Sequence, residues 1–195
     1  MAKLLTKAYF NRHPLAEFSA ARMEYSLLLN PNFLQAANKL IHDVGLMPDS
    51  ETEALAQIEA ENDLNGLLRY VRRELPGDSK LMVRQKLLAR EAESLPEIKR
   101  MLLTTGNDVF VENALHLLVN CKDNPVPWLL EHFDEIRYPY ARSMMCLVLG
   151  FRGGEDVIPF VMRQLELFEA RFSEEHLEQA PLLALYELRA RFETA

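Results

Sequence analysis

The chain has 195 residues, of which 49% are hydrophobic and 26% are charged, and its net charge at pH 7 is −7. This composition is typical of a folded soluble protein and excludes a disordered chain. The acidic balance disfavours a general nucleic-acid binder, and no apolar stretch approaches the ~20 residues that cross a bilayer.

The N-terminal quarter of the chain predicts helices. Apolar residues recur at every third or fourth position, which is the helical period. The pattern predicts one helix that begins near Pro14 and a second over 33–44. A third helix opens at Ser50, where Glu53 completes a capping box. We expect residues 14–62 to form an N-terminal helical cap.

Opposite charges then follow one another along the chain. Residues 49–63 contain six carboxylates and no base, whereas residues 69–90 contain seven bases against two acids. Neighbouring helices of opposite charge could neutralise each other, or the basic stretch could form a local anion-binding patch. The sequence leaves both interpretations open.

A repeat of 30 residues runs through the centre of the chain. Leu68, Ile98, Trp128 and Ile158 are spaced by 30, and each lies in the first turns of a predicted helix. Ser94 and Glu97 form a second capping box, which predicts that one of these helices begins near Ser94. A helix pair of this length buries its apolar stripe only by stacking on neighbouring pairs.

The second helix of the last repeat shows a family pattern. Ala141-Arg142 and Leu149-Gly150 match the second helix of short HEAT-like repeats, and the segment resembles that family. Met145 and Cys146 stand where the family has smaller residues, and the two preceding repeats match less well. Departures from the pattern occur at Met82, Arg90, Glu112 and Asn120.

The resemblance implies the architecture of the whole chain. It covers about residues 63–170 and implies a right-handed α-solenoid of HEAT-like antiparallel helix pairs. With the N-terminal cap and a C-terminal capping helix over 171–195, the chain is predicted to be a single all-α domain, residues 1–195.

The resemblance also implies a binding face, because the second helices of such pairs line the concave side. Positions four residues apart share one face of a helix, and two tyrosines are expected on the rim. The row of residues at these positions on the second helices is either a partner-binding groove or a solvated face. The candidate binding residues are Lys86, Arg90, Glu112, His116, Asn120, Tyr138, Tyr140 and Arg142.

The motifs of common catalytic and metal sites are missing from the sequence. We find no zinc-binding His-Glu-x-x-His, no Gly-x-Ser-x-Gly and no glycine-rich phosphate loop, so we expect no catalytic residue, metal or cofactor. A thiol nucleophile at Cys146, activated by Arg142 one turn away, is the remaining catalytic hypothesis. Cys121 and Cys146 are predicted to lie too far apart for a disulfide.

These observations favour a non-catalytic interaction or adaptor module that binds a peptide or protein. The alternative is a HEAT-like enzyme or enzyme subunit, similar to alkylpurine DNA glycosylases or bilin lyases. Self-association into a weak homo-oligomer through an uncapped solenoid end is a third hypothesis. Reduced thiols and the lack of a signal-peptide core around Lys3 and Lys7 predict a cytoplasmic protein.

Overall fold

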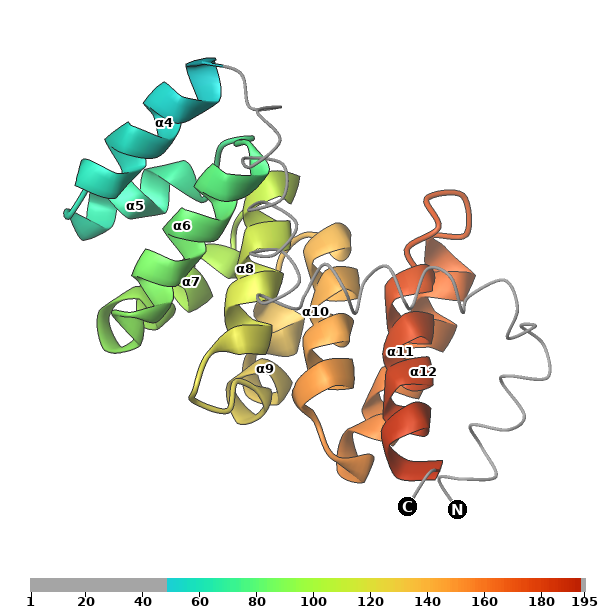
Figure 1. Ribbon diagram of the computed structural model, residues 1–195. Coiled ribbons are helices and arrows are strands. Elements are labelled where there is room, and N and C mark those ends of the chain that lie inside the picture. Colours follow the sequence, from blue (N-terminus) through green and yellow to red (C-terminus); the bar gives the residue numbers. More distant parts are fainter. Residues whose placement is uncertain (1–48, 194–195) are drawn as a thin grey trace. The chain divides into compact units, whose positions relative to one another are not determined.

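The computed structural model describes residues 49–193, and every regular element in this range is helical (Figure 1). The all-α class is therefore confirmed for the described part of the chain. The helices predicted near Pro14 and over 33–44 lie outside it. Within 49–193, no helix has the length and the apolar character needed to cross a bilayer. The described residues fall into two compact units that divide between Lys122 and Asp123.

The first unit, here the α4–α8 unit, is built from five helices. α6 packs against α4 on one side and α8 on the other, and it also contacts α5 and α7. α7 in turn contacts α5 and α8. The helices are α4 (Asp49–Ala60), α5 (Leu64–Tyr70), α6 (Gly77–Leu88), α7 (Glu91–Leu102) and α8 (Asp108–Asn120).

Side-chain caps fix two of these helix starts. The Asp63 carboxylate accepts a hydrogen bond from the backbone N–H of Gly66 at 3.0 Å and opens α5. The Asn107 side chain accepts from the N–H of Phe110 at 2.7 Å and opens α8. Each bond satisfies one of the backbone donors that a helix N-terminus leaves without an intrahelical partner.

The predicted helix start at Ser94 is wrong by about a turn. α7 begins at Glu91, directly after the turn that follows α6, and Ser94 lies inside it. The Ser94 hydroxyl donates to the carbonyl of Leu87 at 2.8 Å, so it ties α7 back to the end of α6 instead of capping its own helix. The other predicted capping box includes Ser50, whose side chain lies outside the described ones.

The second unit, here the α9–α12 unit, contains four α-helices and two short 3₁₀ helices. α12 packs along both α10 and α11, and α10 also contacts α9. Of the segment 171–195, predicted as a C-terminal capping helix, residues 173–178 form turns and the helix α12 begins only at Gln179. The elements are α9 (Val126–His132), η1 (Phe133–Glu135), α10 (Pro139–Arg152), η2 (Glu155–Val157), α11 (Ile158–Arg171) and α12 (Gln179–Glu193).

Glycine permits the close approach of α10 and α12. A Cβ added at Gly150 would lie 2.7 Å from Cα of Ala184 and 2.8 Å from its Cβ. Below this contact the Arg191 guanidinium donates to the carbonyls of Gly150 at 2.6 Å and Gly153 at 2.7 Å. Arg191 of α12 therefore satisfies carbonyls at the C-terminus of α10.

The 30-residue spacing marks buried positions at three of its four residues. Leu68, Ile98 and Ile158 are buried, whereas Trp128 is half-buried and its ring lies 5.3 Å from that of His132. Most apolar positions of the first helices thus face the core of their own unit.

Candidate functional site

The predicted groove residues Lys86 and Arg90 contact the C-terminal end of α4. The Lys86 ammonium donates to the carbonyls of Ile58 at 3.0 Å and Glu61 at 2.8 Å, and also to that of Glu59. The carbonyls at a helix C-terminus attract cations, so Lys86 stabilises the end of α4.

Arg90 acts next to Lys86 in the same way. Its guanidinium donates to the carbonyl of Asn62 at 2.8 Å and pairs with Glu93 at 2.6 Å. Lys86 and Arg90 thus both have protein partners in the structure.

The three groove residues of α8 lie on one face of that helix, as their spacing predicts. Glu112 is exposed, and His116 and Asn120 are half-buried. The Asn120 amide donates to the carbonyl of His116 at 2.8 Å. Burial, together with the nearby Arg84 and Lys80 charges, lowers the pKa of His116 to about 3. His116 is therefore neutral near pH 7.

A buried polar network that the sequence did not reveal lies between α6 and α8. Both Nε and Nη2 of Arg84 donate to Oδ1 of Asn113, at 3.1 and 2.8 Å. The Asn113 amide donates to the carbonyl of Val71 at 3.0 Å. Burial lowers the pKa of Arg84 to about 10, while Glu112 acts in the opposite direction. The spacing of about 30 residues between Arg84 and Asn113 was the available signal, because equivalent positions of successive helices become neighbours.

The remaining predicted groove residues belong to α10 in the other unit. Tyr138 precedes α10, is 38% exposed and has the Arg137 guanidinium 5.7 Å from its ring centre. Tyr140 and Arg142 are half-buried in the first turns of α10. The Arg142 Nε atom is buried and makes no hydrogen bond within the described residues.

The structure disfavours the thiol nucleophile at Cys146. The side chain is fully buried, and its sulfur lies 3.5 Å from the backbone carbonyl of Arg142. Burial raises the pKa of the thiol above its usual range, which opposes formation of the reactive thiolate. Cys121 is also buried, and neither cysteine is part of a disulfide.

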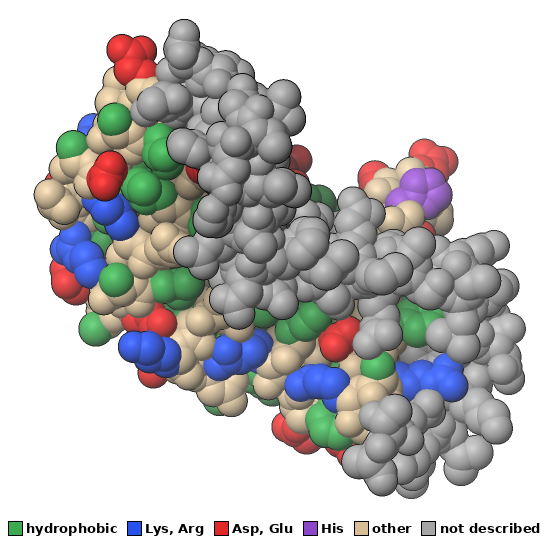
Figure 2. Space-filling model, viewed as in Figure 1, with side chains coloured by type: hydrophobic (Ala, Val, Ile, Leu, Met, Phe, Trp, Pro, Cys, Tyr) green, Lys and Arg blue, Asp and Glu red, His purple; other side chains and the backbone are tan. Residues whose placement is uncertain are grey.

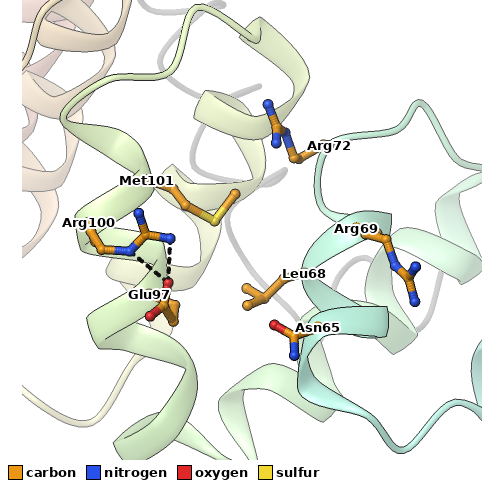
Figure 3. A pocket seen from close by; sticks show the side chains of 7 residues that line it. All are labelled: Asn65, Leu68, Arg69, Arg72, Glu97, Arg100 and Met101. Atoms are coloured by element: carbon orange, nitrogen blue, oxygen red, sulfur yellow. Dashed lines mark hydrogen bonds and ion pairs between the residues drawn. The ribbon is translucent and has the colours of Figure 1, made fainter.

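A solvent-open hollow lies between α5 and α7, and we call it the α5–α7 hollow. Its volume is about 290 Å³. Figure 3 shows Leu68 and Met101 facing each other from the two helices, with polar side chains around them. The lining residues are Asn65, Leu68, Arg69, Arg72, Glu97, Arg100 and Met101.

The charged side chains of the α5–α7 hollow differ in how they are engaged. Arg100 pairs with Glu97 at 2.8 Å, one helical turn away. Within the described residues, the guanidinium groups of Arg69 and Arg72 have neither a hydrogen bond nor an ion pair. In Figure 3 the Arg72 side chain lies on the Met101 side of the hollow, and that of Arg69 points away from Leu68.

The described part of the neighbouring acidic run does not neutralise these arginines. Glu53, Glu59, Glu61 and Asp63 are the acids of that run whose side chains are described, and none forms an ion pair with an arginine of the hollow. Glu61 instead accepts a hydrogen bond from the N–H of Asp63 at 2.8 Å. Figure 2 shows basic and acidic side chains mixed on the visible face of the α4–α8 helices.

Guanidinium groups remain charged in proteins and donate hydrogen bonds in a planar fork. The α5–α7 hollow can therefore bind and orient an anionic group, and an apolar group can contact Leu68 and Met101. Among the described residues, no group of three or more His, Cys, Asp or Glu side chains could hold a metal ion. Comparisons with family models, curated proteins and solved structures find no match to this chain.

Proposed function

We propose that the chain is a non-catalytic interaction module that binds a peptide or a segment of a partner protein. The observation that supports this function is the α5–α7 hollow, which combines an apolar floor with arginines at an open rim. Arginine is enriched at protein interfaces, and an apolar contact surrounded by polar groups is typical of them. The groove residues predicted on α8, and separately those predicted on α10, remain candidates for further binding surfaces under the same proposal.

The proposal includes a HEAT-like arrangement of the helices. In the α4–α8 unit, α6 contacts both α4 and α8, and α7 contacts α5. The second helices begin at Gly77, Asp108 and Pro139, in steps of about 31 residues. These contacts and the regular spacing of the helix starts support stacked helix pairs. Solenoids of such pairs commonly bind polypeptides along their extended faces. The two buried cysteines, which form no disulfide, support a cytoplasmic location.

A displayed library of random short peptides, selected on the purified full chain, tests the function. We expect recovered peptides to bind the wild type and to lose about tenfold or more in affinity for the Arg72→Glu, Arg100→Glu double variant, because charge reversal at an interface repels the selected partner. Binding is measured by fluorescence anisotropy with each labelled peptide.

The matched control reverses two exposed arginines of α11, Arg163 and Arg171, and so changes the net charge equally. This variant should bind the same peptides as the wild type does. Selection that yields no binding peptide would refute binding of unmodified peptides by the module. Binding that is insensitive to Arg72 and Arg100 would leave a peptide-binding module but remove the α5–α7 hollow from it.

A further inference from the structure

We propose that the α5–α7 hollow recognises a phosphorylated side chain, a phosphate monoester, on the peptide partner. This inference rests on the proposed function, since it names the chemical class of peptide that the module binds. The phosphate is bound by Arg72 and Arg100, and Arg69 adds its positive charge at the rim.

Charge balance favours a phosphate over a carboxylate. The residues that line the hollow include three arginines and one glutamate, so their net charge is about +2. A phosphorylated serine or threonine has a charge of about −1.5 to −2 near pH 7, whereas an aspartate or glutamate has −1. A phosphate monoester thus compensates the hollow, and a single carboxylate leaves about one positive charge over.

The hydrogen-bonding geometry also suits a phosphate. The guanidinium of Arg72 has no partner among the described residues, so it is free to donate two parallel bonds to an oxyanion. Arg100 pairs with Glu97 through Nε at 2.9 Å and Nη2 at 2.8 Å. Its remaining N–H groups are directed elsewhere and can serve a ligand. The amide of Asn65, exposed at the edge of the hollow, is a further donor.

The apolar floor indicates that the phosphate belongs to a peptide and not to a free ion. Leu68 is 7% exposed and Met101 is half-buried, and they face each other across the hollow (Figure 3). Inorganic phosphate has no apolar group that could contact them. A peptide side chain beside the phosphorylated residue does, and the flexible methionine adapts to its shape.

The described acids of the chain's own acidic run do not pair with the arginines of the hollow. Asp63 is used as the N-cap of α5, and the Glu61 carboxylate accepts from the N–H of Asp63. The described acids of the run form no ion pair with Arg69 or Arg72. Within the described residues, the acidic run therefore leaves the charge of the hollow to a ligand.

Glu97 allows a test in which removal of a negative charge should strengthen binding of the phosphopeptide. Its carboxylate lies at the hollow and repels a bound phosphate, while it also occupies two donors of Arg100. Glu97→Gln removes the negative charge and weakens the hold on Arg100. The variant should therefore bind a phosphopeptide about two- to fivefold more tightly, as expected for removing an exposed charge.

The test uses three pools of fluorescein-labelled short peptides with random flanks around a fixed central residue, which is phosphoserine, serine or glutamate. Binding to the full chain is followed by anisotropy at about 0.15 M ionic strength. The phosphoserine pool should bind about tenfold or more tightly than either other pool. Arg72→Ala and Arg100→Ala should each weaken it by about tenfold, since charge-assisted hydrogen bonds are lost, and Arg69→Ala should weaken it less.

Three controls define the result. The Arg163→Ala, Arg171→Ala variant should bind like the wild type, and circular dichroism should show that every variant is folded. Inorganic phosphate should compete only at concentrations about a hundredfold above the peptide, because it makes no apolar contact. A single-stranded oligonucleotide, which presents phosphodiesters, should compete no better than inorganic phosphate.

The outcomes separate this inference from the proposed function. If the serine or glutamate pool binds as tightly as the phosphoserine pool, the phosphate inference is wrong and the interaction module stands. If inorganic phosphate or the oligonucleotide binds as tightly as the phosphopeptides, recognition of a phosphopeptide is wrong. If none of the pools binds, both the inference and the proposed function fail.

Discussion

A single buried amide, that of Asn113, connects three parts of the α4–α8 unit. Asn113 is 3% exposed, donates to the carbonyl of Val71 after α5 and accepts from Arg84 of α6. Replacing it with alanine leaves the buried carbonyl of Val71 and the half-buried guanidinium of Arg84 without this partner. We expect Asn113→Ala to lower the free energy of unfolding by about 3 kcal/mol, measured by urea denaturation.

The control for this prediction is Asn65→Ala, because Asn65 is exposed and its side chain forms no hydrogen bond within the described residues. Its effect on the free energy of unfolding should stay within about 0.5 kcal/mol. Equal effects at the two asparagines would contradict the structural role of the network.

His116 should make the stability of the chain depend on pH. Its folded-state pKa is about 3, below the ordinary value of 6.5, because of burial and the Arg84 and Lys80 charges. The unfolded chain therefore binds a proton near pH 6.5 that the folded chain binds only near pH 3. Stability from His116 is present above pH 6.5 and is lost as the pH falls towards 3, with about 2 kcal/mol lost by pH 5.

The measurement compares the wild type with His116→Gln, which cannot take up this proton. Urea titrations give the free energy of unfolding of each protein at pH 7 and at pH 5. The drop from pH 7 to pH 5 should be about 2 kcal/mol smaller in the variant than in the wild type. Identical pH dependence in both proteins would show that His116 accepts a proton in the folded chain as readily as in the unfolded chain.

At the scale of elements, the contact between α10 and α12 depends on the absence of a side chain at Gly150. A Cβ there would lie 2.7 Å from the Cα of Ala184. Gly150→Ala gains helix propensity of about 1 kcal/mol but forces the helices apart, which costs about 1–3 kcal/mol. We expect net destabilisation of about 1 kcal/mol, seen as a lower Tm.

Two further variants test this explanation. Gly154→Ala should have little effect, because the added Cβ meets only the carboxylate of Asp156, which can rotate away. Ala184→Gly in the Gly150→Ala background should restore little of the stability, because the Cα of residue 184 stays in place and glycine inside α12 itself costs about 1 kcal/mol. A stabilised Gly150→Ala protein would mean that the helices separate at little cost.

Local sequence patterns predicted the existence of helices better than their exact starts. The helical period in the described range agrees with the structure, because it follows from the nearest packing neighbours. Ser94 did not cap a helix, because the turn between α6 and α7 is short and its hydroxyl bonds to Leu87. A capping motif cannot reveal a partner that lies across such a turn.

The α5–α7 hollow was predictable only in part. Arg69 and Arg72 belong to the basic stretch that the sequence marked as a candidate anion patch. Arg100, Glu97 and Met101 lie about 30 residues further on, and only the packing of α7 beside α5 brings them to the same hollow. The basic stretch therefore indicated that the site could bind an anion, whereas the residues contributed by α7 could be found only from the fold.

At the scale of the whole molecule, each unit contains one buried thiol. Cys121 is 2% exposed and belongs to the α4–α8 unit, whereas Cys146 is fully buried in the α9–α12 unit. A thiol reagent should therefore label both cysteines of the urea-unfolded chain. Over the same time it should label neither cysteine of the native chain. The measurement is the thiol titre with Ellman's reagent, with and without urea.

Single-cysteine variants extend this measurement to each unit. Cys146→Ala leaves Cys121 to report on the α4–α8 unit, and Cys121→Ala leaves Cys146 to report on the other. The labelling rate of each should rise with urea in parallel with unfolding of its own unit. Rapid labelling of Cys146 without urea would contradict its burial and would revive the nucleophile hypothesis.

The contacts of Lys86 show that a positive charge counted in the sequence need not be available to bind a ligand. An ammonium group has three N–H bonds, and Lys86 directs them at three backbone carbonyls, those of Ile58, Glu59 and Glu61. The ammonium of Lys86 thus has no further N–H group with which to donate a hydrogen bond to an approaching molecule. It acts on such a molecule only through the long-range attraction or repulsion of its charge. Arginine is no substitute at this position, since a flat guanidinium cannot converge on three carbonyls as a tetrahedral ammonium does.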